Sequence, residues 1–317
     1  MTSNFHRIKR YTLYIIFFVG FTVISCTGNS KKQQAKTSKE FSLPSIPLII
    51  TDPQARASYL ADHYWDNFDF NDTALINKPE IAEQAFVNYI EILSHTALPV
   101  IVSSINNTIE QALANEYMFV YFTDLFEKYL YDPNSPMRNE EVYIVALDYI
   151  VASPKVDETN KIRPSFQLEH LNKNRPGQIA ADFTYTLANG KREKMHNIKS
   201  DYLVIFFNNP GCQACKQIQF GFEQSPVILR MQAMGKLKVL AMYTDRDIDA
   251  WEQYQSVIPT QWINGYDDAF VINDEKLYDL RAIPNLYLLD KDKRVILKDA
   301  PPEHLELQLI NIMQAQQ

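Results

Sequence analysis

The chain has 317 residues, of which 46% are hydrophobic and 22% are charged, and its formal net charge at pH 7 is −7. This hydrophobic fraction is normal for globular proteins, and the length allows two ordinary domains. The negative charge is mild and spread out, and the basic clusters all lie before Glu40. A nucleic-acid-binding protein would show a basic patch on its folded part, so we expect no nucleic-acid partner.

The first 25 residues have the pattern of a secretion signal. A basic leader around Arg7 and Arg10 precedes an apolar run over residues 11–24, and the small residue Ser25 follows. A basic start, a short apolar stretch and a small residue at the cleavage point are typical of a signal peptide. An uncleaved membrane anchor is the alternative, but a transmembrane helix needs about 20 apolar residues, and this run is shorter.

Cys26 ends the tetrad Val23-Ile24-Ser25-Cys26, which resembles the bacterial lipobox. The resemblance implies that the signal is cleaved before Cys26 and that this residue is lipidated, which anchors the protein in the lipid bilayer. Residues 26–42 are mostly polar, and we expect them to form a flexible tether. In many lipoproteins, Asp after the lipidated Cys favours the inner membrane. Because Thr27 stands there, we expect a periplasmic protein anchored in the outer membrane rather than the inner membrane.

Residues 43–170 have the apolar spacing of helices, and we expect an all-α helical domain of unknown function with an aromatic-rich core. Asp52 followed by Pro53 is a helix start signal, because Asp caps a helix and Pro suits its first position. Phe119, Phe122 and Phe126 recur at intervals of three to four residues, which indicates one face of a helix. The expected helices cover residues 55–65, 79–93, 98–113, 116–131 and 140–151.

Residues 174–317 alternate between strand and helix patterns, which predicts an α/β domain with a mixed sheet and helices on both faces. The Asn189-Gly190 pair predicts a tight hairpin turn, and Pro226 predicts a break in a long helix. The expected strands cover residues 183–187, 202–207, 237–243, 286–290 and 294–298. The expected helices cover residues 213–234, 248–254, 275–280 and 302–314.

The two remaining cysteines, Cys212 and Cys215, form a Cys-x-x-Cys at the junction of a buried strand and a helix. Cys212 falls near the helix N-terminus, where free backbone N–H groups and the helix dipole stabilise a thiolate. The thiolate is the nucleophile, so such a residue reacts at neutral pH, where an ordinary thiol with a pKa near 8.5 mostly does not. Cys215 lies one helical turn further and is close enough to form a disulfide with it.

Residues 206–215, read with Ile283-Pro284 and the flanking strands, resemble the thioredoxin fold. More narrowly, residues 174–317 resemble the TlpA/ResA-like extracytoplasmic thioredoxins, whose entry segment is matched by residues 176–183. The helical half resembles an uncharacterised domain found ahead of such thioredoxins in bacterial lipoproteins. The resemblance implies an α/β thioredoxin-like fold preceded by an all-α domain. It also implies an enzyme without a cofactor, a membrane-anchored thiol-disulfide oxidoreductase that acts as a reductase.

The same resemblance implies roles for individual residues. Cys212 is the attacking thiolate, Cys215 is the resolving thiol, and Pro284 is a cis-proline that faces the disulfide. The backbone of Ile283 pairs with an extended segment of the substrate. The implied partners are protein thiols and disulfides of the cell envelope, together with an unidentified membrane reductant.

Two positions depart from the thioredoxin pattern. Gly211 stands just before the first Cys, where thioredoxins often have Trp. Phe206 and Ile218 occupy the positions where a buried acid often assists proton transfer. Glu223 and Lys216 are the nearest ionisable residues, and solvated helix surface is the expected place for both. These departures lie next to the Cys pair, so they affect the prediction of its redox potential more than the prediction of the fold.

Two alternatives to a redox pair remain. A zinc site needs four ligands, or three and a water, and His196 and His304 are isolated in the sequence, so we expect no metal. The other alternative is a non-catalytic envelope scaffold with a structural disulfide, in which the helical domain binds a partner. Thiol chemistry separates the two, because a structural disulfide resists reduction below about −300 mV, whereas catalytic pairs have higher potentials.

Overall fold

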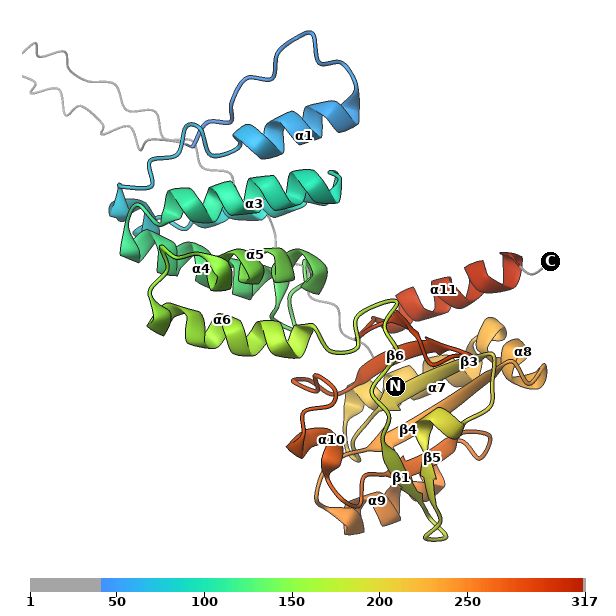
Figure 1. Cartoon of the computed structure of the whole chain (residues 1–317). Coiled ribbons are helices and arrows are strands. Elements are labelled where there is room, and N and C mark those ends of the chain that lie inside the picture. Colours follow the sequence, from blue (N-terminus) through green and yellow to red (C-terminus); the bar gives the residue numbers. More distant parts are fainter. Residues whose placement is uncertain (1–40, 316–317) are drawn as a thin grey trace, which may run out of the picture. The chain divides into compact units, whose positions relative to one another are not determined.

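The computed structural model describes residues 41–315, which are drawn in colour in Figure 1. Residues 41–317 form one compact unit, and the description below concerns that unit. The predicted signal of residues 1–25, the predicted lipidation site Cys26 and nearly all of the predicted tether lie outside the described residues. Between residues 41 and 315, no helix has both the length and the apolar character that crossing a membrane requires.

Residues 53–171 form a helical region, as the apolar spacing predicts. The Asp52 side chain accepts a hydrogen bond from the Ala55 N–H at 2.8 Å, and Pro53 occupies the first helical position. Asn115 and Asn139 cap two later helices in the same manner. The elements are α1 (Pro53–His63), η1 (Thr73–Asn77), α2 (Ala82–Leu93), α3 (Leu98–Ala112), α4 (Glu116–Leu130), α5 (Glu140–Ala152) and α6 (Glu158–Leu171).

The last helix of this region, α6, was not among the expected helices. Its buried residues include the polar Gln167 and His170, so the apolar spacing that reveals the other helices is absent. Pro164 lies inside it, where proline removes a backbone donor and normally argues against a helix. Asp157 caps its start by accepting from the Thr159 N–H at 2.8 Å. Packing of α6 against α5 therefore outweighs a poor local pattern.

The core of the helical region is built from aromatic rings around Trp65, which is 2% exposed. The Trp65 ring centroid lies 5.1 Å from that of Phe122, 5.2 Å from Phe68 and 5.4 Å from Tyr89, all in edge-to-face contacts. Edge-to-face pairs each add about 0.5–1.5 kcal/mol beyond the area they bury. The expected aromatic core is confirmed.

Residues 174–315 form a second region around a mixed seven-stranded sheet. Its strand order is β2-β1-β5-β4-β3-β6-β7, with β3 parallel to β4 and antiparallel to β6. The strands are β1 (Thr184–Leu187), β2 (Arg192–Lys194), β3 (Tyr202–Phe207), β4 (Leu237–Tyr243), β5 (Ile263–Tyr266), β6 (Asn285–Asp290) and β7 (Val295–Leu297). The central strands β3 and β4 are apolar and almost wholly buried, as a strand covered on both faces must be.

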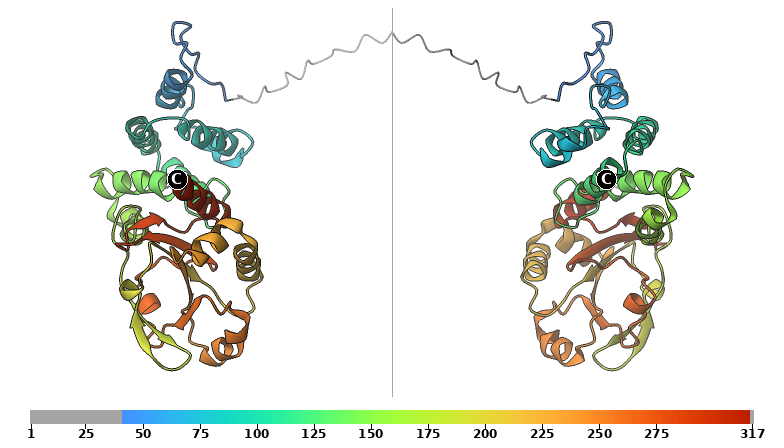
Figure 2. Two further views of the ribbon diagram at one scale, coloured as in Figure 1. Left: turned by 90° about the vertical axis from the view of Figure 1, so that its right-hand side faces the viewer. Right: turned by 90° about the vertical axis from the view of Figure 1, so that its left-hand side faces the viewer.

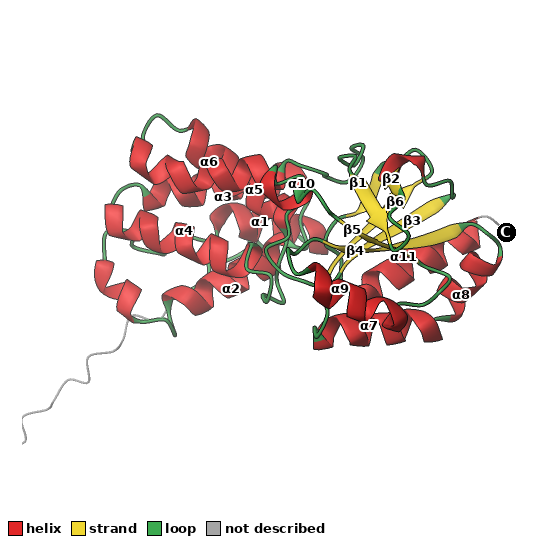
Figure 3. Ribbon diagram, turned by 90° about the horizontal axis from the view of Figure 1, so that it is seen from below, coloured by secondary structure: helices red, strands yellow, loops and turns green. Residues whose placement is uncertain are grey.

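The two faces of this sheet are covered differently. Val204 and Phe206 of β3 point to a core shared with α7 (Gln213–Gln224), α8 (Pro226–Ala233) and α11 (Pro302–Ala315). Leu203 and Ile205 point to the other core, which is covered by η2 (Met195–Asn197), α10 (Val271–Asp274) and irregular segments. Figure 3 shows α7 and α8 together on one side of the sheet. Helices were predicted on both faces. Long helices cover the first face, whereas the second is covered by two short helices and irregular segments.

One further prediction about this region is wrong, and one strand was not predicted. The sequence indicated a helix over residues 275–280, but the short helix α10 ends at Asp274, and Tyr278 is buried in an irregular segment against the sheet. Strand β5 was not expected because Asn264 and Gly265 have low strand propensity. Gly265 is required there, since a Cβ would lie 2.7 Å from the Tyr185 ring.

The remaining connections follow the local signals. Pro226 does break the long helix, and Ser225 caps α8 by accepting from the Ile228 N–H. Gly190 has φ +78° in the turn that joins β1 and β2, as the Asn189-Gly190 pair predicts. Between β4 and β5 the chain forms α9 (Ile248–Tyr254) and η3 (Gln255–Val257).

Ion pairs connect the helical region to the sheet region. Arg281 and Lys298 of the sheet region both contact the carboxylate of Glu140, at 2.8 and 3.2 Å. Arg138 of the helical region pairs with Asp299. In both views of Figure 2 the green helices α5 and α6 are the ones beside the sheet region. The division into two domains between residues 170 and 174 stays a prediction.

Asp299 is the most perturbed acid of this junction. Its side chain is 17% exposed, and burial raises the pKa of Asp299 to about 6, while Arg138 acts to lower it. An acid whose pKa is raised on folding stabilises the folded state fully below its unfolded pKa, near 3.9. That stabilisation is lost as the pH rises through the folded value. Between about pH 4 and pH 6, Asp299 therefore increasingly opposes folding.

Asp299→Asn should remove this pH-dependent contribution, and Asn tolerates the φ of +44° at this position. We expect the free energy of unfolding of the variant, relative to the parent, to increase by roughly 1–3 kcal/mol from pH 4 to pH 6. Urea unfolding at a series of pH values measures this difference. Asp292→Asn, at an exposed turn, is the control and should parallel the parent. Parallel profiles of parent and Asp299→Asn would contradict the assignment.

Candidate functional site

The site is built where strand β3 ends and helix α7 begins. Residues 208–211 form the connecting loop, and Cys212 is the N-cap residue of α7. Gly211 has φ +79°, a left-handed conformation that glycine adopts without steric cost. Thioredoxins often have Trp at this position. Here the left-handed backbone favours a residue without a side chain, which is consistent with Gly211.

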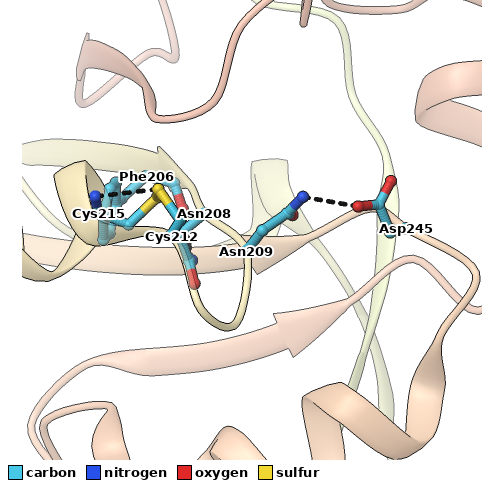
Figure 4. Close-up of a disulfide and its surroundings, with 6 residues drawn as sticks. All are labelled: Phe206, Asn208, Asn209, Cys212, Cys215 and Asp245. Atoms are coloured by element: carbon cyan, nitrogen blue, oxygen red, sulfur yellow. Dashed lines mark hydrogen bonds between the residues drawn. A yellow bond between two sulfur atoms is a disulfide. The ribbon is translucent and has the colours of Figure 1, made fainter.

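Cys212 and Cys215 form a disulfide, with their Cα atoms 5.3 Å apart (Figure 4). Cys215 is 2% exposed, whereas Cys212 is only half-buried. The Cys215 N–H points to the Cys212 sulfur at 3.1 Å, as a helix N-terminus directs its free N–H groups to the capping residue. The pair therefore has one accessible sulfur at the positive end of a helix and one sheltered sulfur behind it.

Apolar side chains stand at the two positions, one in β3 and one in α7, where thioredoxins often have a buried acid near the pair. Phe206 fills that strand position, is fully buried and contacts the Phe222 and Trp262 rings, with centroids 6.4 and 6.1 Å away. Ile218 packs against the same apolar core. The side chain of Lys216 is at the helix surface, as expected. The sulfur of Cys215 thus lies in an almost entirely apolar environment.

The Ile283–Pro284 peptide bond is cis, as the resemblance implies. The pairing of β3 with β6 sets its place, because Phe207 at the end of β3 lies opposite Asn285, the residue after Pro284. The cis-proline therefore lies at the level where the chain leaves β3 for the Cys loop. Ile283 is half-buried and contacts the cores on both faces of the sheet. The role of both residues in substrate docking stays a prediction.

A cleft beside the Cys loop was not anticipated from the sequence. Asn209 donates from Nδ2 to Asp245 Oδ2 at 2.6 Å, which joins the Cys loop to the segment after β4 (Figure 4). The cleft has a volume of about 530 Å³ and is also lined by Arg246 and Phe270. One signal could have indicated it. The run of polar residues 244–247 follows a strand parallel to β3, and the carboxyl ends of parallel strands meet at one edge of the sheet.

The histidines considered for zinc are not near the Cys pair. His196 Nε2 forms a hydrogen bond to the Ala180 carbonyl at 2.8 Å, and His304 lies at the start of α11. Within the part of the chain that the structure describes, no three His, Cys, Asp or Glu side chains are grouped so that they could hold a metal ion.

Comparison with known proteins agrees with this architecture. Residues 24–174 match a family model described as "Domain of unknown function (DUF5106)". The crystal structure of a thioredoxin-like protein from Bacteroides caccae is 48% identical to this chain, with a TM-score of 0.84. That match covers 87% of this chain and 99% of the other, so it includes both the helical region and the sheet region.

Two other matches cover less than half of this chain. The C-terminal domain of an uncharacterized protein from Bacteroides fragilis is 46% identical and covers 43% of this chain and 98% of its own, with a TM-score of 0.43. Nucleoredoxin from Xenopus laevis is 24% identical over 117 residues, which is 37% of this chain. The chain spans only 28% of the length of that protein.

A Cys-x-x-Cys disulfide at a helix N-terminus, a cis-proline at the same edge of the sheet and a mixed sheet between two apolar cores define a thioredoxin-like protein. The chain belongs to this family, as a TlpA-like thioredoxin domain of the Bacteroidetes type preceded by a helical DUF5106 region. The fold class and family expected from the sequence are confirmed.

The difference in exposure between the two sulfurs predicts different reactivity. After reduction, iodoacetamide should modify Cys212 at least about tenfold faster than Cys215, because Cys212 is accessible and lies at the helix N-terminus. Mass spectrometry of proteolytic peptides during a timed reaction measures both rates. Labelling in urea is the control, since unfolding should make the two rates similar. Equal rates in the folded chain would contradict the assigned geometry.

Proposed function

We propose that this chain is a lipid-anchored thiol-disulfide oxidoreductase of the bacterial envelope that reduces disulfides in client proteins. The observation that supports this most strongly is the combination of a half-exposed Cys212 at a helix N-terminus, a buried Cys215 and the cis-proline loop beside them. The thioredoxin-like relative that covers nearly the whole unit adds support.

The proposed cycle begins with the reduced pair. The Cys212 thiolate attacks one sulfur of the client disulfide, the client S–S bond breaks, and the released client thiolate takes up a proton. The Cys215 thiol then loses its proton and attacks the Cys212 sulfur of the mixed disulfide. The second client thiol leaves, and the Cys212–Cys215 disulfide forms. The client gains two electrons, which the pair loses and a membrane dithiol reductant restores.

The surroundings of Cys212 favour reduction over strong oxidation. Strong oxidants have a reduced form that is unusually stabilised, with a very low thiolate pKa. In the described residues, the stabilising groups at Cys212 are backbone N–H groups and the dipole of α7, and no Lys, Arg or His side chain bonds to its sulfur. A thiolate stabilised in this moderate way suits a reductant. Ile283 and Pro284 would hold the client backbone during the exchange.

Replacement of either cysteine by serine should separate the two steps of the cycle. Cys212→Ser should lower disulfide reduction to the uncatalysed rate, because no attacking thiolate remains. Cys215→Ser should leave the attack intact but accumulate mixed disulfides with clients, since the resolving thiol is gone. Insulin reduction and non-reducing gels of cell envelopes measure the two effects. Full activity of Cys212→Ser would refute the mechanism.

A redox titration distinguishes this enzyme from a scaffold with a structural disulfide. A reversible two-electron transition of the Cys212–Cys215 pair between about −300 and −120 mV would support an exchange function, and a value near the low end would support a reductase. A pair that stays oxidised throughout that range would indicate a structural disulfide. The role of the helical region would then have to be sought in partner binding.

The anchor at Cys26 has its own test. The lipobox-like tetrad and the polar residues after it support attachment to the periplasmic side of the envelope, with the outer membrane favoured by Thr27. Cys26→Ser should leave the chain uncleaved and without incorporated radiolabelled palmitate in a bacterial host, because the acylated thiol is missing. Ser25→Ala keeps a small residue before the cleavage point and should be processed normally. Palmitate in the Cys26→Ser chain would contradict the assignment.

A further inference from the structure

The loop that carries the cis-proline is bound by residues of the helical region. It runs from Asp279 to Asn285, and the Asn285 Nδ2 donates to the Asp279 carbonyl at 3.1 Å, which closes the loop at its base. Arg281, three residues before Pro284, reaches out of this loop. Its side chain is 25% exposed and contacts residues of the helical region.

The Arg281 guanidinium group is bound on several sides. Its Nη1 donates to the Tyr131 carbonyl at 2.7 Å, and its Nη2 donates to Glu140 Oε1 at 2.8 Å. Its Nε donates to both carboxylate oxygens of Asp279 in the same loop, at 2.8 and 2.9 Å. The guanidinium carbon lies 3.4 Å from the centre of the Tyr131 ring, as in a cation–π contact. Only the planar, multidentate group of arginine can satisfy all these contacts together.

The residues that bind Arg281 are themselves rigidly held. Tyr131 follows the last residue of α4, is 8% exposed and stacks on Tyr143 of α5 with ring centroids 5.1 Å apart. Glu140 is the first residue of α5, and its second oxygen forms an ion pair with Lys298 at 3.2 Å. Lys298 also donates to the carbonyl of Leu171, at the end of α6, at 2.9 Å. The ends of α4, α5 and α6 thus converge on this point.

Charge balance makes the contact specific. The side chains of Glu140 and Asp279 are 14% and 7% exposed, and each carries a negative charge opposite Arg281. Removal of one member of a buried ion pair leaves the other charge without compensation in a medium of low dielectric constant. The loop therefore has one strongly preferred position relative to the helical region.

We propose that Arg281 is a positioning residue through which the helical region fixes the cis-proline loop and thereby sets the affinity of the site for polypeptide disulfides. This inference rests on the proposed function. It assigns the DUF5106 region a part in client binding. The backbone of Ile283 can pair with an extended client segment only when the loop is held in register with β3.

The inference predicts a selective effect on substrates. A polypeptide disulfide uses the loop backbone as well as the sulfurs, whereas a small disulfide without a peptide backbone uses the sulfurs alone. Loss of loop position should therefore weaken binding of the polypeptide and leave the reactivity of the Cys212 thiolate unchanged. A general defect of folding would affect both substrates.

The test uses the full chain with its Cys pair reduced in advance, in single-turnover reactions with insulin and with hydroxyethyl disulfide. For Arg281→Met we expect the half-saturating insulin concentration to increase by about tenfold, because displacement of a positioning element by about 1 Å can cost as much or more. The rate with hydroxyethyl disulfide and the equilibrium constant for reduction of the pair by a reference dithiol should stay within about twofold of the parent. Circular dichroism establishes that each variant is folded.

Two further variants make the test specific. Glu140→Gln weakens the contact from the side of the helical region and should reproduce a smaller part of the same insulin defect, while the double variant should be no worse than Arg281→Met. Arg175→Met is the matched control, because it removes another ion pair between the two regions, Arg175–Glu141, that does not involve the loop. It should leave both reactions unchanged. Hydrogen exchange of residues 279–286 should accelerate in Arg281→Met and not in the control.

The outcomes separate the inference from the proposed function. A parent chain that reduces neither substrate would refute the oxidoreductase proposal itself. An active parent with an unchanged Arg281→Met variant would refute the positioning role alone. If Arg281→Met weakens insulin binding but Glu140→Gln does not, Arg281 contacts the client directly, and the role of the helical region is refuted. Should Arg281→Met fail to fold, Glu140→Gln and the exchange measurement decide the question.

Discussion

The arrangement of the site around Cys212 and Cys215 depends on how strand β3 is paired with its two neighbours. β3 is hydrogen-bonded to β4 in parallel and to β6 in the antiparallel direction, with Phe207 opposite both Met242 and Asn285. This register brings the Cys loop, the segment after β4 and the cis-proline to one edge of the sheet. A shift of one residue would turn the side chains of β3 to the opposite face and separate Cys212 from Pro284.

The chemistry of the pair follows from its two different environments. Cys212 lies where a helix offers N–H groups and a favourable dipole, while Cys215 lies against Phe206 and the apolar core beneath it. In the proposed cycle, the first step uses the more accessible sulfur at the helix N-terminus, and the second uses the sulfur that the apolar core shelters. Phe206 stands where thioredoxins often have an acid, so in that cycle water would accept the proton of Cys215.

The helical region contacts the sheet region directly through ion pairs. The residues that bind Arg281 and Lys298 lie just after the end of α4, at the start of α5 and at the end of α6, and the ion pairs there are largely shielded from water. The relative from Bacteroides caccae contains both regions in a single crystal structure and resembles this chain over both. A contact that reaches from α5 to the cis-proline loop gives a physical reason for the two regions to occur together.

The sequence by itself determined the features that depend on neighbouring residues. The cap at Asp52, the break at Pro226 and the buried strand ahead of Cys212 were predicted, because each depends on residues within one turn or one strand. The thioredoxin-like fold was predicted from the order of its motifs along the chain. Only the tertiary structure decided the rest. Strand β5 and helix α6 have poor local patterns and are stabilised by packing against other elements. The expected helix at residues 275–280 is an irregular segment in which Tyr278 is buried against the sheet. The Arg281–Glu140 contact joins residues 141 positions apart, so no local pattern could have indicated it.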